Sequence, residues 1–519
     1  MTDPKPSKDE LAYAMKEFPN LPHPEMLPIK FKGEAKIKVG VLEKLALRKR
    51  GEATEDIVKE ILKKNRIYSI RSDEKQEMWI YDKGIYIPQG RSYCKEVVRH
   101  ILGDVFTNSL ASDVIAKIEV DTFIDPDKFF QVSDVNVIAV KNGLLNLKTK
   151  KISLFSDQKI FFNQIPVEYD LKAKCPAIEK FFKEILEHEK DVSVIEELFG
   201  FLLWKEHFME KGFMFNGEGR NGKSKLTELM KRFLGVRNCT NISLVQLEKE
   251  TFALAGLLHK MANLSPDISS SALKHSGVFK AITGRDHLSA PRKFLSNVEF
   301  VNYSKQVFCC NDLPKPHDTS MAFWSRWILF KFPFTFLSQK ELDALAEGER
   351  ENVKLADPDI ISKITTDEEL SGLLNLALSG LKRLHKQGDF SYSKNTAEVK
   401  EMWIRKADSF SAFLQDECEE DFDSYISKIH LNKAYTKYCR THKVKVMGLR
   451  STKTTLEERG IDSRRLGDAS SREYVWDGIK FKDKLIDVSR IKDMDLENYP
   501  EGVSTKAPAS PKPEKKKKV

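Results

Sequence analysis

Residues 217–224 combine glycine, lysine and serine at a spacing suited to phosphate binding. They read Gly-Glu-Gly-Arg-Asn-Gly-Lys-Ser, which fits the pattern G-x-x-x-x-G-K-[ST]. Glycines let backbone N–H groups close around phosphate oxygens, because no Cβ stands in the way. The lysine of this pattern reaches the β- and γ-phosphates, and its hydroxyl residue ligates Mg²⁺. We predict that a nucleoside triphosphate and its Mg²⁺ bind here, at Gly217, Gly219, Asn221, Gly222, Lys223 and Ser224.

The segments on either side of this loop predict a strand and a helix. The apolar run "GFMF" (212–215) predicts a buried strand that leads into the loop. "SKLTELMKRFLG" (224–235) predicts a helix with an apolar face, and its last residue, Gly235, is a helix stop. Such a helix points the positive end of its dipole at the phosphates.

Three polar residues follow apolar segments downstream, and each has two interpretations. Asp267 ends the strand candidate in "LLHKMANLSPD" and could hold Mg²⁺, or it could lie in a Ser-Pro-Asp surface turn. Asn311 ends "YSKQVFCCN" and could contact the γ-phosphate or the attacking water, or it could belong to an Asn-Asp turn. Arg326 precedes the apolar run "WILFKF" and could be an arginine finger, or an ordinary cation at a strand edge.

The segment between Asp267 and Asn311 predicts a hairpin. Two strand-like pieces flank "APRKFLSN", with Arg292, Lys293 and Phe294 near the tip. Cations next to an aromatic residue suit contacts with single-stranded nucleic acid, although an exposed turn has the same composition.

The composition predicts a globular protein in a reducing, intracellular setting. The 519 residues include seven scattered cysteines without a Cys-x-x-Cys pair, and no apolar run is long enough to span a membrane. The net charge is +9, from 86 basic and 77 acidic residues. Residues 506–519 contribute +5 of it, from six lysines and one glutamate. Nucleic acid is a plausible partner, but the charge alone does not establish it.

The pattern of elements predicts an α/β core between flanking domains, because strands alternate with helices from 212 to about 336. The C-terminal segment predicts three helices and then a strand pair in "YVWDGIKF", which suits a winged helix-turn-helix. The predicted parts are an N-terminal extension (1–70), an α+β and helical domain (71–205), the ATPase domain (206–337), a helical segment (338–407), a winged-helix-like DNA-binding domain (408–487) and a basic disordered tail (488–519).

In their order and spacing, these motifs resemble superfamily 3 helicases, and above all the helicase half of phage, plasmid and poxvirus-type primase–helicases. The resemblance rests on "FNGEGRNGKSKL", "ANLSPDIS", "FKAITGRDHL", "VFCCNDLPKP" and "SRWILFKF", and it extends over roughly residues 75–485. It implies an AAA+-like ATPase that uses ATP and Mg²⁺, forms a hexamer and moves 3′→5′ on single-stranded DNA.

The resemblance also implies roles for single residues. Asp267 would be the second-motif carboxylate, Asn311 the polar sensor and Arg326 a finger acting on the neighbouring subunit. Arg292, Lys293 and Phe294 would face DNA inside the ring. The family often has two adjacent acidic residues where this chain has Pro266-Asp267, which puts fast hydrolysis in question. Only about 70 residues precede the matching region, so we expect no primase activity in this chain.

The leading hypothesis is a replicative DNA helicase of a virus, plasmid or integrated element. It would act on single-stranded and forked DNA in the host cytoplasm, beside a separate primase and DNA polymerase. The first alternative is an origin-binding initiator or DNA-remodelling scaffold that binds ATP but unwinds poorly. The second is a P-loop kinase for a small metabolite, which predicts neither a ring nor stimulation by DNA.

Overall fold

The structure is a computed structural model and describes most of the chain between residues 35 and 482. The described residues are 35–72, 76–130, 134–266, 268, 276–293, 295–316, 318, 320–442, 444, 446–466 and 473–482. Contacts divide the chain into two compact units, one of residues 1–82 and 86–131 and one of residues 83–85 and 132–519. The six-part division predicted from sequence stays a prediction. Residues 1–34 of the predicted N-terminal extension and the whole predicted basic tail lie outside the described residues.

The first unit is a four-stranded sheet with helices packed around it. Its sheet has the order β3-β2-β1-β4. Strands β2 and β3 form a hairpin, with positive φ angles at Lys83 and Gly84 in the turn. The elements of this unit are α2 (Ala35–Ala46), α3 (Arg50–Lys64), β1 (Ile67–Ile70), β2 (Met78–Asp82), β3 (Ile85–Ile87), α4 (Gly90–Leu102), α5 (Asn108–Asp121), β4 (Phe123–Ile124) and α6 (Pro126–Phe130).

The second unit is built on a parallel sheet with the strand order β14-β8-β13-β10-β9. Its strands are β8 (Gly212–Asn216), β9 (Cys239–Thr240), β10 (Ala262–Ser265), β13 (Lys305–Cys310) and β14 (Trp327–Lys331). All five residues of β8 are buried, as expected of a central strand covered on both faces. The prediction of an α/β core is confirmed at this level, as a mixed α/β fold with a parallel sheet.

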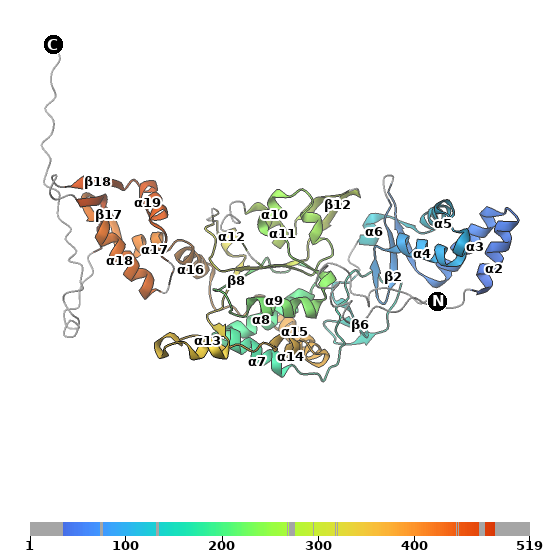
Figure 1. The fold of residues 1–519 in the computed structure, drawn as a ribbon, viewed down its shortest axis with the longest axis horizontal. Helices are drawn as coiled ribbons and strands as arrows, with labels where there is room; N and C mark the ends of the chain where they lie inside the picture. The colour runs from blue at the N-terminus through green and yellow to red at the C-terminus, as the bar shows by residue number, and fades with distance from the viewer. Residues whose placement is uncertain are drawn as a thin grey trace, which may run out of the picture. The chain divides into compact units, whose positions relative to one another are not determined.

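Helices lie on both faces of the parallel sheet (Figure 1). Alternate side chains of the central strand enter two separate cores. Phe213 and Phe215 join the core on one face, and Met214 joins the core on the other. The first face is covered by α7 (Pro176–Ile185), α8 (Glu189–Leu203), α9 (Lys223–Leu234), α14 (Ile360–Ile364) and α15 (Asp367–Gln387). The second is covered by α10 (Leu244–Lys249), α11 (Gly277–Thr283), α12 (Met321–Trp324) and α16 (Thr396–Ala407). The sheet is therefore the middle layer of three.

Smaller elements surround this layer. An antiparallel meander precedes α7 and consists of β5 (Val137–Val140), β6 (Gly143–Asn146) and β7 (Ile152–Ser153). Strands β11 (His287–Arg292) and β12 (Leu295–Val301) pair as the expected hairpin. Within the segment expected to be helical from residue 338, β16 (Val353–Leu355) pairs in parallel with β15 (Thr335–Leu337), and α13 (Gln339–Asp343) lies between them.

The C-terminal segment has its own core of buried side chains, and it contains a strand that sequence reasoning missed. The observed order is α17 (Ser409–Glu417), β17 (Cys418–Ser427), α18 (Lys428–Thr441), α19 (Leu449–Glu458), β18 (Asp462–Leu466) and β19 (Glu473–Phe481). The three predicted helices are present, but "YVWDGIKF" forms the single strand β19, so the prediction of a strand pair within it is wrong. Strand β19 pairs instead with β17 and β18. In β17 the acidic residues 419–421, which are poor strand formers, follow Cys418, and the strand is held by its pairing with β19.

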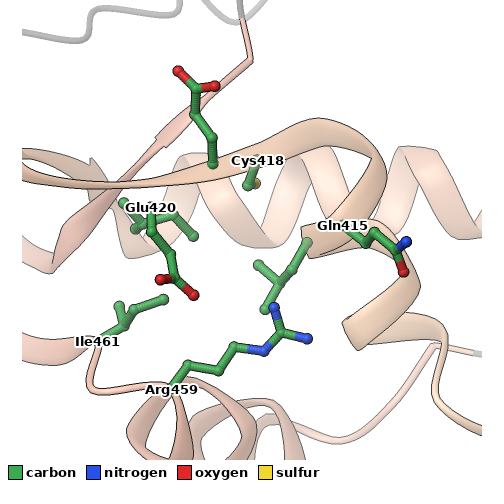
Figure 2. Close-up of a pocket in the computed structure, with 8 residues that line it drawn as sticks. Gln415, Cys418, Glu420, Arg459 and Ile461 are labelled. Atoms are coloured by element: carbon green, nitrogen blue, oxygen red, sulfur yellow. The ribbon is translucent and has the colours of Figure 1, made fainter.

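A cavity of about 430 Å³ lies between α17, β17, α19 and β19 (Figure 2). Glu420 and Arg459 extend toward it beside apolar side chains such as Ile461. None of the residues predicted to bind nucleotide or DNA lines it.

Candidate nucleotide-binding site

The predicted phosphate-binding loop connects the carboxyl end of β8 to the amino end of α9, as expected. Two of its glycines are required by their surroundings. A Cβ on Gly217 would lie 2.2 Å from Asn221 Nδ2 and 2.7 Å from the Phe332 carbonyl oxygen. Gly222 has a φ of +90°, and a Cβ there would lie 2.6 Å from Ile185 Cγ2. A Cβ on Gly219 would meet no atom within 4 Å, so the middle glycine is not required by packing.

The loop presents hydrogen-bond donors that no described residue satisfies. The backbone N–H groups of residues 218–222 donate to no acceptor in the described part of the chain. The side-chain amide nitrogen of Asn221 is buried and also lacks a partner there. Consecutive unpaired N–H groups at a helix amino terminus form a concave site for an anion. The loop therefore fits a phosphate group on its own geometry, and Ser224, the exposed second residue of α9, fits a magnesium ligand.

Lys223 and Asn311 meet at this edge of the sheet. Asn311 directly follows β13, the strand beside β8. The ammonium group of Lys223 donates to the carbonyl oxygens of Gly217 and Glu218 and, over 3.3 Å, to Asn311 Oδ1. The lysine side chain is buried, so it lies folded back over its own loop.

Two residues that sequence reasoning did not select complete this edge. Asn216, the last residue of β8, donates from Nδ2 to the carbonyl oxygen of Asn311 at 2.9 Å. Its Oδ1 accepts from Lys406 Nζ of α16, also at 2.9 Å. Burial, and then the charge of Lys331 at the end of β14, lower the pKa of Lys406. No local motif marks Lys406, because the residues of this contact are 190 positions apart in sequence.

Helix α16 also holds the segment that follows Asn311. The indole N–H of the buried Trp403 donates to the Pro314 carbonyl oxygen at 2.8 Å. The ammonium group of Lys315 lies 2.9 Å from the carboxylate of Asp408, which also caps the amino end of α17. The segment 311–315 therefore contacts both the phosphate-binding loop and the helix that leads into the C-terminal segment.

The structure does not bring Arg326 to the loop. Arg326 immediately precedes β14, and its carbonyl oxygen accepts from Gly212 N at the amino edge of the sheet. The loop follows the opposite edge, about 13 Å away along β8 at roughly 3.3 Å per residue. The guanidinium is mostly buried and is bound by Glu210 and by the Ala322 carbonyl oxygen. Within one chain, these contacts keep Arg326 away from Lys223.

The remaining predicted residues are only partly described. Arg292 ends β11, and the exposed Lys293 follows it in the hairpin turn. Asp267 and Phe294 lie outside the described residues. Strand β10, which precedes Asp267 in sequence, pairs with β13 in the sheet. Within the described residues, no group of three or more His, Cys, Asp or Glu side chains is placed to hold a metal ion.

Two family models match separate parts of the chain. Residues 53–187 match a family described as D5 N terminal like. Residues 215–326 match a family of unknown function (DUF5906), and this match runs from β8 to Arg326. Lys223, Asn311 and Arg326 all lie inside it.

In the described part of the chain, no helix combines the length and the apolar character that crossing a membrane requires.

Two curated viral proteins are similar in sequence. "Putative helicase V13" of Sputnik virophage is 25% identical over 298 residues, which cover 53% of this chain and 35% of that protein. "Putative helicase L207/L206" of Acanthamoeba polyphaga mimivirus is 23% identical over 337 residues, which cover 62% of this chain and 34% of that protein. The chain therefore spans about a third of the length of these relatives.

Solved structures of the NrS-1 C-terminal region in its apo form also match. They cover 81% of this chain and 98% of theirs, at 12–14% identity and TM-scores of 0.40–0.41. The matches to the D5 N terminal like family and to the two viral proteins confirm the likeness that the motifs indicate: the chain resembles the helicase part of viral primase–helicases.

Proposed function

We propose that this chain is an ATP-dependent DNA helicase of the superfamily 3 type, acting in the replication of a virus or related element. The observation that carries the proposal is the meeting of Lys223 with Asn311 beside a loop of unpaired N–H groups. The strand order β14-β8-β13-β10-β9 supports an AAA+-like core, because the loop follows the central strand β8 and the sensor segment follows its neighbour β13.

The chain's own residues supply the parts of a phosphoryl-transfer site. The N–H groups of the loop bind the phosphates, and Lys223 leaves its loop carbonyls to contact the β- and γ-phosphates. Asn311 orients the γ-phosphate or the attacking water. Ser224 and Asp267 would hold Mg²⁺, which would neutralise charge on the phosphates when bound.

We propose that a homo-hexameric ring completes the site. Because Arg326 is bound at the amino edge of its own sheet, its catalytic partner is the nucleotide of a neighbouring subunit. The hairpins of β11 and β12 then face single-stranded DNA through Arg292, Lys293 and Phe294, and movement runs 3′→5′. The ring acts on forked DNA in the host cytoplasm with a separate primase and polymerase.

The first test is ATP-dependent strand separation on forked duplexes with either a 3′ or a 5′ single-stranded tail. We expect the protein to separate the 3′-tailed substrate, and Lys223→Ala to abolish both hydrolysis and separation. Lys231→Ala is the matched control, because Lys231 lies two turns along the same helix. Separation of only the 5′-tailed substrate would contradict the direction, and an unchanged rate in Lys223→Ala would contradict the site.

A DNA-remodelling initiator is the second candidate. The separate core of the C-terminal segment favours it, since three helices and a three-stranded sheet there suit a duplex-binding module. ATP and duplex binding with no separation of either fork would support this function over the helicase.

A further inference from the structure

Asn216 makes hydrogen bonds in two directions at the end of β8. Its Nδ2 donates to the Asn311 carbonyl oxygen at 2.9 Å, and its Oδ1 accepts from Lys406 Nζ at 2.9 Å. An ammonium group can only donate and a carbonyl oxygen can only accept. Only one orientation of the Asn216 amide satisfies both partners, so Lys406 fixes the direction in which Asn216 donates.

These contacts form a continuous chain of four residues, which we call the asparagine relay. It runs from Lys406 to Asn216, from Asn216 to Asn311, and from Asn311 to Lys223. The four residues come from α16, the end of β8, the segment after β13 and the start of α9. The relay therefore connects a helix outside the central sheet to the lysine predicted to bind the triphosphate.

The position of Lys406 is fixed by packing. Trp403, one turn earlier on α16, is buried in the core that also contains Met214 and Phe308. Its N–H donates to the Pro314 carbonyl oxygen, three residues after Asn311. Among the described residues, Lys406 Nζ contacts no carboxylate, and its hydrogen-bond partner is the neutral Asn216 amide. Burying a cation in part without a carboxylate partner costs free energy, which favours a functional reason for the placement of Lys406.

We propose that Lys406 and Asn216 are positioning residues for ATP hydrolysis, which hold Asn311 where it contacts the γ-phosphate or the attacking water. This inference rests on the proposed ATPase function and deepens it. Neither residue needs to touch the nucleotide. Binding of the α- and β-phosphates depends on the loop N–H groups and on Lys223, whereas placement of the γ-phosphate also depends on Asn311, which Lys406 and Asn216 hold.

The relay predicts that a substitution within it lowers the rate of ATP hydrolysis but leaves the affinity for ADP nearly unchanged. Lys406→Met keeps most of the unbranched side chain but removes the donor, so Asn216 loses one of the two partners that orient its amide. We expect kcat to fall about tenfold and the affinity for a non-hydrolysable ATP analogue to fall about fivefold, as for loss of one ordered polar contact. The affinity for ADP should stay within about twofold of the wild-type value.

Three further variants complete the experiment. Lys406→Arg retains a donor and should recover most of the analogue affinity. Asn216→Asp keeps a partner for Lys406 but cannot donate to Asn311, so it should match Lys406→Met. Lys400→Met is the control, because this lysine lies on the same helix outside the relay.

The measurements are nucleotide titrations of the full chain, steady-state ATPase rates and melting temperatures. Loss of kcat and of analogue affinity with ADP affinity retained, in Lys406→Met and Asn216→Asp but not in Lys400→Met, supports the relay. Equal behaviour of Lys406→Met and Lys400→Met overturns it, and so does an equal loss of ADP affinity. A wild-type protein that binds nucleotide but separates no DNA contradicts only the helicase, because the affinity ratio still tests the relay. A wild-type protein that binds no nucleotide overturns both.

Discussion

At the scale of single residues, Lys223 is hydrogen-bonded to its own loop and would have to leave these partners to contact a phosphate. Lys223 donates to the carbonyl oxygens of Gly217 and Glu218, so the ammonium group would have to exchange these partners for phosphate oxygens in order to bind a triphosphate. The loop backbone itself needs little change, because its N–H groups are already unpaired within the described chain. Such preorganisation reduces the free-energy cost of binding.

The two end glycines of the loop should be sensitive to a single added methyl group. In Gly222→Ala the methyl would meet Ile185 and the residue would keep an unfavourable φ of +90°. Strain of about 1–3 kcal/mol corresponds to roughly a 5- to 150-fold loss of nucleotide affinity. Gly219→Ala should lose less, because nothing lies within 4 Å of its added Cβ. Nucleotide titrations of both variants make the comparison, and equal losses would contradict the packing argument.

Local segments of the site were predictable from sequence, and distant contacts were not. The strand, the loop and helix α9 follow one another, so an apolar run and a glycine pattern were enough to predict them. Asn311 was found because it ends an apolar run. Lys406 was missed because it is one of several cations on α16, and only folding brings it to Asn216. The roles of Asp267 and Phe294 stay predictions.

At the scale of elements, two buried lysines fix the connection between α8 and the central sheet. Lys305 begins β13 and donates to the carbonyl oxygens of Trp204, Glu206 and Tyr303 over 2.8–3.0 Å. Lys205 donates to the Val137 carbonyl oxygen at 3.3 Å and lies 4.6 Å from the Phe161 ring centre. Burial lowers the pKa of Lys305 well below its usual range and that of Lys205 to about 8.

The pKa of Lys205 predicts a pH-dependent contribution to stability. Between pH 8 and about 10.5, the unfolded chain holds the lysine proton more tightly than the folded chain, so stability rises with pH in this window. From pH 7 to 10 the gain is roughly 2 kcal/mol. Lys205→Met lacks the titrating group and should not show this gain. Raising the pH from 7 to 10 should therefore make the wild type more stable relative to the variant by that amount.

Denaturant unfolding at pH 7 and pH 10 measures this shift. Lys190→Met, on the exposed side of α8, is the control and should follow the wild type at both pH values. A difference between wild type and Lys205→Met that is the same at both pH values would show that Lys205 does not titrate in this window.

At the scale of the whole molecule, the two edges of the parallel sheet carry different parts of the proposed chemistry. The carboxyl edge carries Lys223 and Asn311, and the amino edge carries Arg326 in its contact with Glu210. In the proposed ring, one chain would therefore contain both halves of a site that it could not assemble alone. In a closed ring, each interface would join the carboxyl-edge residues of one subunit to Arg326 of the next.

Because Lys223 and Arg326 lie at different edges of the sheet, we predict that two inactive variants restore ATPase activity when they are mixed. Lys223→Ala should lose nucleotide binding but keep Arg326, whereas Arg326→Ala should bind nucleotide but lack the proposed finger. Each variant alone should lose at least tenfold in ATPase rate, as for removal of a catalytic cation. In a 1:1 mixture, about a quarter of the interfaces join an intact loop to an intact finger, so hydrolysis should recover in proportion. Arg232→Ala, an exposed arginine on α9, is the control and should keep full activity. If Arg326 acted within its own chain, no interface in the mixture would be complete, and the rate would stay at the level of the separate variants.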